Sequence, residues 1–149
     1  MLELNLPTFD IKVIKKDGRL FVFDILRKKY LALTPEEWVR QHFVNYLVAE
    51  KGYPQNLIVN ELEIELNSQK KRCDSVVYSR EGCPLVIVEY KAPEINITQK
   101  VFDQIARYNI VLRVEYLIVS NGYDHFCCKV NYDEKSIEYL EAIPCYDQL

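Results

Sequence analysis

The chain has 149 residues, of which 49% are hydrophobic, with only four Gly and six Pro. This length suits a single domain over residues 1–149, and the composition excludes a disordered or low-complexity protein. The net charge of −3 argues against tight, sequence-independent binding of nucleic acid, which usually needs a basic surface. No apolar stretch approaches the roughly 18 residues of a membrane span, and residues 1–5 lack a basic signal-peptide start. We therefore expect a soluble, cytoplasmic protein without a membrane partner.

The chain contains five cysteines, an odd number, without a C-x-x-C spacing. Zinc sites usually need thiolates at short, regular spacings, and a disulfide framework needs paired cysteines. We expect reduced, mostly buried thiols.

The first half of the chain predicts a hairpin, a helix and a strand. Two β-rich runs surround Asp17-Gly18, which is typical of a β-hairpin turn. Residues 34–37 (Thr-Pro-Glu-Glu) have the pattern of a helix start with a capping box, and Gly52 ends this helix. Apolar and acidic residues alternate over residues 57–66, which predicts a half-buried strand with Glu61 and its neighbouring glutamates facing outward.

The second half predicts two further strands over residues 73–78 and 84–91, and a helix that begins at Thr98 and runs to about residue 112. Strands follow over residues 115–120, 125–130 and 137–140, with a turn at Asn121-Gly122. This order predicts a mixed α/β fold in which the sheet lies between helices.

The dense apolar run over residues 84–88 reads as a strand buried on both faces, and Glu89 and Lys91 stand at its end. These two residues are two apart and share one face of the strand. If the preceding strand pairs with this one as a hairpin, Asp74 falls beside Glu89. Two carboxylates with an adjacent ammonium form a hard oxygen site for Mg²⁺ and a cation that can hold a water molecule.

A simpler interpretation is available for each of these residues. A Glu and a Lys at this spacing near a strand end most often form a solvated edge or an ordinary ion pair. The apolar run before them, the second carboxylate and Pro93 just after them favour a hydrolytic metal site. From the residues alone, both interpretations stay open.

An ordered set of short motifs also resembles a known family. An Asp followed by Glu-x-Lys at the end of a hydrophobic strand resembles the PD-(D/E)xK nuclease superfamily, and in particular the nuclease region at the N-terminus of type I restriction enzyme R subunits. The resemblance covers about residues 23–126, and Cys73 departs from it by standing where the superfamily name implies Pro. The matching segments are residues 33–41 (LTPEEWVRQ), 71–74 (KRCD), 88–93 (VEYKAP), 104–108 (QIARY) and 120–122 (SNG).

The resemblance implies a restriction-endonuclease-like mixed sheet flanked by helices and a Mg²⁺-dependent DNA endonuclease, with Mn²⁺ as a possible substitute. Asp74, Glu89 and the carbonyl of Tyr90 would hold the metal, and Lys91 would position water or offset transition-state charge. The resemblance also implies secondary roles in the site for Gln104 and for one acidic residue at the start of the first helix, which is either Glu36 or Glu37, with Glu37 favoured. The simpler role of both glutamates is to stabilise the helix start, where Glu37 would complete the capping box.

Four residues are candidates for contacts with DNA. Lys71 and Arg72 belong to a basic cluster that runs directly into Asp74, where a phosphate contact and a solvated strand end are both reasonable interpretations. The resemblance makes Arg40 a candidate contact for a phosphate or a carboxylate. Tyr108 shares a helix face with Gln104, and there it could contact DNA, help to orient Lys91 or simply pack in the core.

The sequence has no P-loop motif, so we expect any DNA-translocating motor or specificity subunit to be encoded separately. The alternative function is a non-catalytic module that binds nucleic acid or a partner while retaining the nuclease fold.

Overall fold

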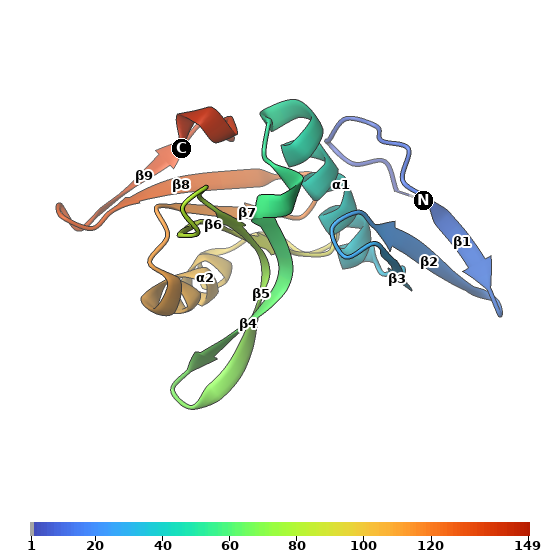
Figure 1. Cartoon of the computed structure of the whole chain (residues 1–149), viewed down its shortest axis with the longest axis horizontal. Coiled ribbons are helices and arrows are strands. Elements are labelled where there is room, and N and C mark those ends of the chain that lie inside the picture. Colours follow the sequence, from blue (N-terminus) through green and yellow to red (C-terminus); the bar gives the residue numbers. More distant parts are fainter. Residues whose placement is uncertain (1) are drawn as a thin grey trace.

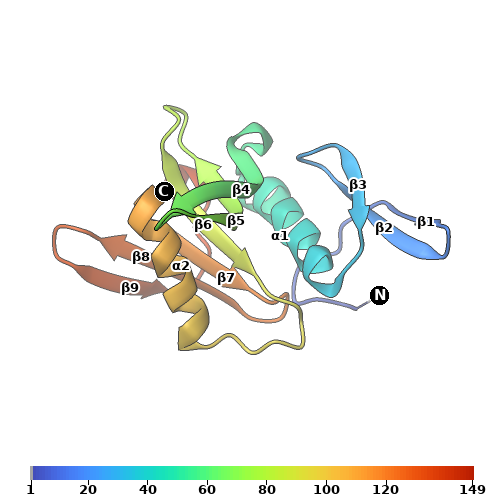
Figure 2. The same cartoon turned by 90° about the horizontal axis from the view of Figure 1, so that it is seen from below.

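The computed structural model describes residues 2–149, which form a three-stranded sheet, a six-stranded sheet and two α-helices (Figures 1 and 2). A short 3₁₀ helix, Gln55–Leu57, precedes the first strand of the larger sheet. A second one, Tyr146–Gln148, follows the last strand of that sheet. None of the helices among residues 2–149 is long and apolar enough to cross a membrane. All five cysteines are free; three are buried and two are exposed.

The smaller sheet is an antiparallel meander of β1 (Val13–Lys16), β2 (Arg19–Asp24) and β3 (Lys29–Ala32). The predicted hairpin is confirmed, and its turn residues Asp17 and Gly18 both have positive φ. The third strand was not predicted because most of its side chains are exposed, which leaves no apolar alternation to read. Both views place this sheet beside α1 (Figures 1 and 2).

Helix α1 (Pro35–Lys51) begins and ends where the sequence predicts. The Thr34 hydroxyl accepts a hydrogen bond of 3.0 Å from the Glu37 backbone N–H, and Gly52 ends the helix with φ 70°. The capping box is not completed, because the Glu37 carboxylate accepts hydrogen bonds from Arg40 and Gln41.

The larger sheet has its strands in chain order, and every neighbouring pair is antiparallel except β6 and β7, which are parallel. Helix α2 (Gln99–Leu112) makes the crossover between these two parallel strands. All the strands that the sequence predicts from residue 57 onward are present in this larger sheet. They are β4 (Ile58–Leu66), β5 (Gln69–Tyr78), β6 (Pro84–Tyr90), β7 (Tyr116–Ser120), β8 (His125–Asn131) and β9 (Ser136–Leu140).

The two helices cover opposite faces of this sheet. Along β6, Val86, Val88 and Tyr90 pack in the cluster that contains α1, while Ile87 packs in the cluster that contains α2. Successive strand residues point to opposite faces, so a strand buried on both sides reads as a continuous apolar run. The predicted mixed sheet between helices is confirmed.

The turn after β7 offers a test of backbone strain. Gly122 has φ 89°, and a Cβ there would lie 2.7 Å from Leu4 Cδ2 and 3.2 Å from Val39 Cγ2. Gly82 has a similar φ of 85° with nothing within 4 Å. We expect Gly82→Ala to lower the free energy of unfolding by about 1–2 kcal/mol through φ alone, and Gly122→Ala to lower it by at least about 1 kcal/mol more through overpacking. Equal losses in urea unfolding would contradict the packing part of this prediction.

Candidate active site

Asp74 lies where β5 and β6 begin to separate. Their antiparallel pairing extends to Ser75 opposite Val88. Beyond that pair, Asp74 Oδ2 accepts a 2.8 Å hydrogen bond from the Tyr90 backbone N–H. A side-chain carboxylate thus satisfies a backbone donor at the end of the ladder, which fixes Asp74 beside Glu89.

Glu89 and Lys91 meet at the end of β6, on the side of the sheet covered by α2. The Lys91 Nζ atom lies 3.6 Å from Glu89 Oε1, and Gln104 on α2 contacts both side chains. Gln104 Nε2 donates to Glu89 Oε1 at 3.1 Å, and its Oε1 lies 3.5 Å from Lys91 Nζ. The structure therefore brings Asp74, Glu89, Lys91 and Gln104 together from β5, β6 and α2.

The pKa values of both carboxyls in this acidic pair are raised, although Lys91 and Arg40 lie close to them. Glu89 is only 4% exposed, and its Oε2 atom has no hydrogen-bond partner. Burial, and then the neighbouring charge of Asp74, raise the pKa of Glu89 to about 8. Burial also raises the pKa of Asp74, although the Tyr90 N–H and Arg40 oppose that rise.

These features fit a divalent cation. A cation between the two carboxyls would supply a partner for the orphan oxygen and would favour the charged form of both groups. The residue before Lys91 is Tyr90, whose side chain turns to the other face of the sheet and whose hydroxyl meets Ser75 at 2.8 Å. Only the Tyr90 backbone lies at the carboxyl pair. Among residues 2–149 there is no group of three or more His, Cys, Asp or Glu side chains that could hold a metal ion, and this acidic pair has two members.

The acidic residue that α1 directs toward this pair is Glu36, whereas the sequence favoured Glu37. Glu37 is 8% exposed, and its carboxylate is 2.6 Å from Arg40 Nη1 and 3.0 Å from Gln41 Nε2. Burial and then the charge of Asp74 raise the pKa of Glu36, and Glu36 lines one cavity with Lys91 and Gln104. Adjacent helix residues point in different directions, and only the packing of α1 decides which one faces the site.

Arg40 and Tyr108, two candidates for contact with DNA, are both buried. Arg40 is 3% exposed and binds carboxylates, with its Nη2 atom 3.4 Å from Asp74 Oδ1. Tyr108 is 7% exposed and packs in the α2 core, where its hydroxyl accepts a 3.2 Å hydrogen bond from Gln104 Nε2. Arg40 therefore shows the carboxylate contacts, and Tyr108 the core position, that the sequence left open beside a contact with DNA.

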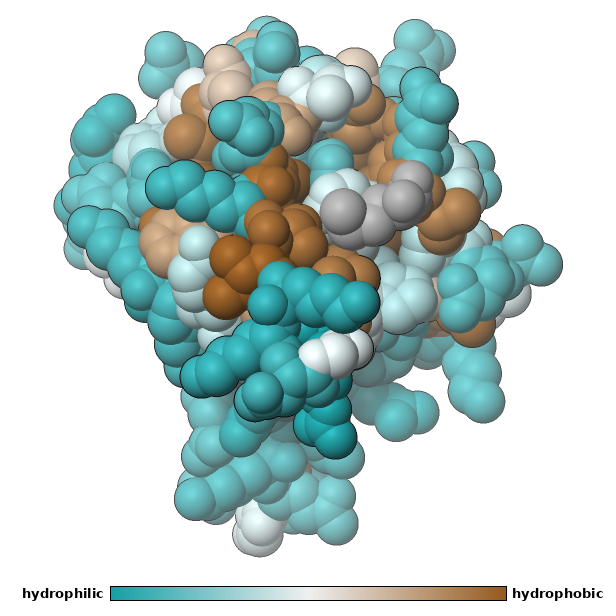
Figure 3. Space-filling view, turned by 90° about the vertical axis from the view of Figure 1, so that its right-hand side faces the viewer, coloured by the Kyte–Doolittle hydropathy of each residue, from teal (hydrophilic) through white to brown (hydrophobic). Residues whose placement is uncertain are grey.

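Lys71 and Arg72 are exposed on the β4–β5 hairpin, which projects from the body of the molecule (Figure 1). The projecting end is strongly hydrophilic, as the bottom of Figure 3 shows. Lys71 pairs with Ile64 and Arg72 with Glu63, so the two basic side chains point to opposite faces of the hairpin. Both side chains are exposed, but they do not form one patch.

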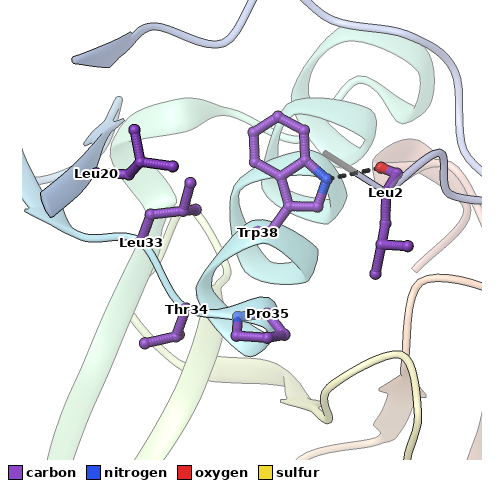
Figure 4. A pocket seen from close by; sticks show the side chains of 6 residues that line it. All are labelled: Leu2, Leu20, Leu33, Thr34, Pro35 and Trp38. Atoms are coloured by element: carbon purple, nitrogen blue, oxygen red, sulfur yellow. Dashed lines mark hydrogen bonds between the residues drawn. The ribbon is translucent and has the colours of Figure 1, made fainter. Parts of the chain in front are cut away.

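Two cavities differ in what they could hold. One of about 400 Å³ opens directly onto Lys91 and Gln104 and has both polar and apolar walls; its other lining residues include Glu36, Asn96, Thr98 and Lys100. The other, of about 240 Å³, lies between α1, β2 and the N-terminal segment, where Trp38 Nε1 donates to the Leu2 carbonyl at 3.0 Å (Figure 4). Leu2, Leu20 and Leu33 line this second cavity, which contains no titratable side chain, whereas Glu36 and Lys91 line the first.

Sequence patterns did not reveal two charged residues near the site, Arg27 and Glu61. Arg27 belongs to a basic run that resembles a solvated turn, and Glu61 was predicted to face outward. Glu61 has φ 55°, which breaks the alternation of β4 and turns its carboxylate toward Arg27 and Arg40. A single strand sequence carries no signal for such a backbone exception.

The family model for the type I restriction enzyme R protein N terminus (HSDR_N) matches residues 35–144. The chain belongs to this family. No curated protein matches it.

A solved structure supports the same fold. The chain is similar to a fragment structure assigned to an HsdR subunit of a type I restriction enzyme from Vibrio vulnificus YJ016, with 21% sequence identity and a TM-score of 0.57. The match covers 80% of this chain and 25% of that chain. This chain therefore spans about a quarter of the length of the solved relative.

Proposed function

We propose that this protein is a Mg²⁺-dependent DNA endonuclease, a single cytoplasmic domain of the type I restriction R-subunit kind. The observation that carries the proposal is the buried Glu89 carboxyl beside Asp74, with one oxygen unpartnered and Lys91 Nζ 3.6 Å from the other. A buried carboxyl that lacks a donor for one oxygen favours its protonated form unless a cation binds there. This carboxyl lacks one partner, as a metal ligand would before its metal binds.

The roles follow from the contacts. Asp74, Glu89 and the Tyr90 carbonyl would hold Mg²⁺ or Mn²⁺, and Glu36 is the acidic residue of α1 placed to support them. The chemistry that the ion supplies when bound is polarisation of the scissile phosphate and a lower pKa for a water molecule. Lys91 holds that water or offsets the charge that develops on the phosphate. Gln104 positions Glu89 and Lys91, and Tyr108 positions Gln104.

The substrate we propose is DNA. The cavity beside Lys91 would receive the scissile phosphate, and the exposed hairpin that carries Lys71 and Arg72 would contact the backbone on either side. In a type I restriction system, motor and specificity functions would act together with this domain. The net charge of −3 makes a modest, salt-sensitive DNA affinity the expected behaviour of this chain alone.

The direct test is plasmid cleavage with Mg²⁺, with Mn²⁺ and with a chelator. We expect nicked or linear product only with a divalent ion, and none from Asp74→Asn. Cleavage that persists in the chelator would contradict the metal-dependent mechanism. DNA binding with no cleavage under any of these conditions would indicate a non-catalytic module.

Divalent ions should also stabilise the fold, because two neighbouring carboxyls repel each other without a cation. At a Mg²⁺ or Mn²⁺ concentration about 100 times the dissociation constant, the gain in stability is about 2.7 kcal/mol, and the melting temperature rises accordingly. Asp74→Asn should remove most of this rise, while Glu63→Gln, on the exposed hairpin, should keep it. A melting curve of the parent protein that millimolar Mg²⁺ and Mn²⁺ leave unmoved would contradict the metal site.

A further inference from the structure

Six charged residues link the N-terminal sheet to the candidate metal site, and we call them the arginine–carboxylate network. They come from the end of β2 and the turn after it, from α1, and from β4 and β5. The members are Asp24, Arg27, Glu37, Arg40, Glu61 and Asp74.

Arg27 enters the network from the turn between β2 and β3, which precedes the family-matched residues 35–144. Its Nε atom donates to Asp24 Oδ2 at 2.8 Å, and Asp24 is fully buried. Asp24 Oδ1 accepts the backbone N–H groups of Leu26 and Arg27, and Asn60 Nδ2 donates to Asp24 Oδ2 at 3.2 Å. These contacts hold the guanidinium of Arg27 in one direction, toward β4 and α1.

Two carboxylates bridge Arg27 to Arg40. Glu61 accepts Arg27 Nη1 at 3.1 Å on one oxygen and Arg40 Nη1 at 3.5 Å on the other. Glu37 has one oxygen 3.9 Å from Arg27 Nη2 and the other 2.6 Å from Arg40 Nη1. Both bridges use the same nitrogen of Arg40, which leaves Arg40 Nη2 for Asp74 Oδ1 at 3.4 Å.

Arg27 allows Arg40 to keep one nitrogen for Glu37 and Glu61 and the other for Asp74. Arg40 is buried and has three carboxylates around it, and Arg27 shares two of them. Arg72 also lies 3.9 Å from Glu61, but it is largely exposed, so water screens its charge. Without Arg27, Glu37 and Glu61 would draw the Arg40 guanidinium toward themselves and away from Asp74. The positive φ of Glu61 supports this reading, since a strained residue persists where its surroundings hold it in place.

We infer that Arg27 is a positioning residue of the active site, through which the N-terminal sheet holds Asp74 in place by way of Glu61, Glu37 and Arg40. The basic run at residues 27–29 is thus divided: Arg27 turns inward to the network, while Lys28 and Lys29 remain exposed. The inference rests on the proposed function only because the proposed function makes Asp74 a metal ligand.

The test compares Arg27→Gln and Arg27→Lys with Lys29→Gln, which removes one positive charge from the same region outside the network. The first readout is hydrogen exchange of the Tyr90 amide in metal-free buffer, because that N–H donates to Asp74 Oδ2. Energetic coupling through such a network predicts exchange between about twofold and about thirtyfold faster in Arg27→Gln. The amides of Ile87 and Ile118, buried in the same sheet, report any global loss of stability and should change less.

The second readout is Mn²⁺ affinity by calorimetry, which should weaken in Arg27→Gln within the same range of about twofold to about thirtyfold. Arg27→Lys keeps the charge and should lie between Arg27→Gln and the parent, and it serves as the main variant if Arg27→Gln fails to fold. A Tyr90 exchange rate that matches Lys29→Gln would overturn the inference, as would an unchanged Mn²⁺ affinity in a parent that binds the ion. If the parent does not bind Mn²⁺, the proposed function fails, and the Tyr90 amide alone decides the inference.

Discussion

Lys91→Ala is expected to lower the rate of DNA cleavage by about 10²–10⁴-fold while leaving the fold and DNA affinity nearly unchanged. Lys91 is the first residue after β6, its side chain is 24% exposed, and it lines the cavity of about 400 Å³ that we assign to the scissile phosphate. A group that acts mainly on transition-state charge contributes to the rate and little to ground-state binding. Plasmid cleavage and DNA binding, measured on the same preparation, check both parts of the prediction.

The fold should tolerate Lys91→Ala because of the protonation state of Glu89. If Lys91 only neutralised a buried, ionised Glu89, its removal would cost about 3–5 kcal/mol of stability. With a pKa of about 8, however, Glu89 is mostly protonated at neutral pH in the metal-free protein, so little charge is left unpaired. The catalytic role of Lys91 therefore predicts that Lys91→Ala is stable and inactive. A role as a structural ion-pair partner predicts that Lys91→Ala is unstable.

The matched control is Lys15→Ala, which removes one exposed ammonium from β1, away from the site. It should cleave DNA at the parental rate. A Lys91→Ala protein that also cleaves at the parental rate would exclude the catalytic role of Lys91. A large loss of unfolding free energy in Lys91→Ala at neutral pH would instead favour the structural ion pair.

Glu89→Gln is expected to stabilise the metal-free protein at alkaline pH and to abolish its stabilisation by Mg²⁺. The pKa of Glu89 rises from 4.5 to about 8 on folding, so the folded state binds more protons than the unfolded state between these pH values. The free energy of unfolding of the parent must then fall as the pH rises through this window. The shift corresponds to at most about 5 kcal/mol, and the coupling to Asp74 reduces it.

Gln at this position carries no charge, so this part of the pH dependence should disappear. Urea unfolding between pH 5 and about pH 9 should show the Glu89→Gln curve crossing above the parent curve in the metal-free protein. Adding Mg²⁺ should raise the parent curve most at the alkaline end, where Glu89 loses its proton most easily, and should leave Glu89→Gln unmoved. Glu63→Gln, an exposed carboxyl on β4, is the control and should follow the parent. A parent whose stability is flat between pH 5 and pH 8 would contradict the raised pKa.

Much of the fold could be predicted from the sequence because it depends on local patterns. Thr34, Pro35 and Gly52 mark the limits of α1, since capping and backbone conformation act within one turn of a helix. The continuous apolar run in β6 indicates a strand that is buried on both faces, and Pro93 indicates that this strand ends shortly before it. The hairpin geometry then makes a meeting of Asp74 with Glu89 and Lys91 predictable, although their roles remain a proposal.

Only the tertiary structure decided which neighbouring residue faces the site. Glu36 and Glu37 have the same chemistry at adjacent positions, and the packing of α1 against the sheet directs Glu36 to the cavity and Glu37 to Arg40. Burial likewise places Arg40 among carboxylates and Tyr108 in the core beside α2, although their residue types also suit a DNA surface. Arg27 and Glu61 enter the network through a turn far away in the sequence and a left-handed backbone position. A short stretch of sequence determines where a helix or strand begins and ends, but the direction of a charged side chain depends on partners far away in the chain, which only the folded molecule brings together.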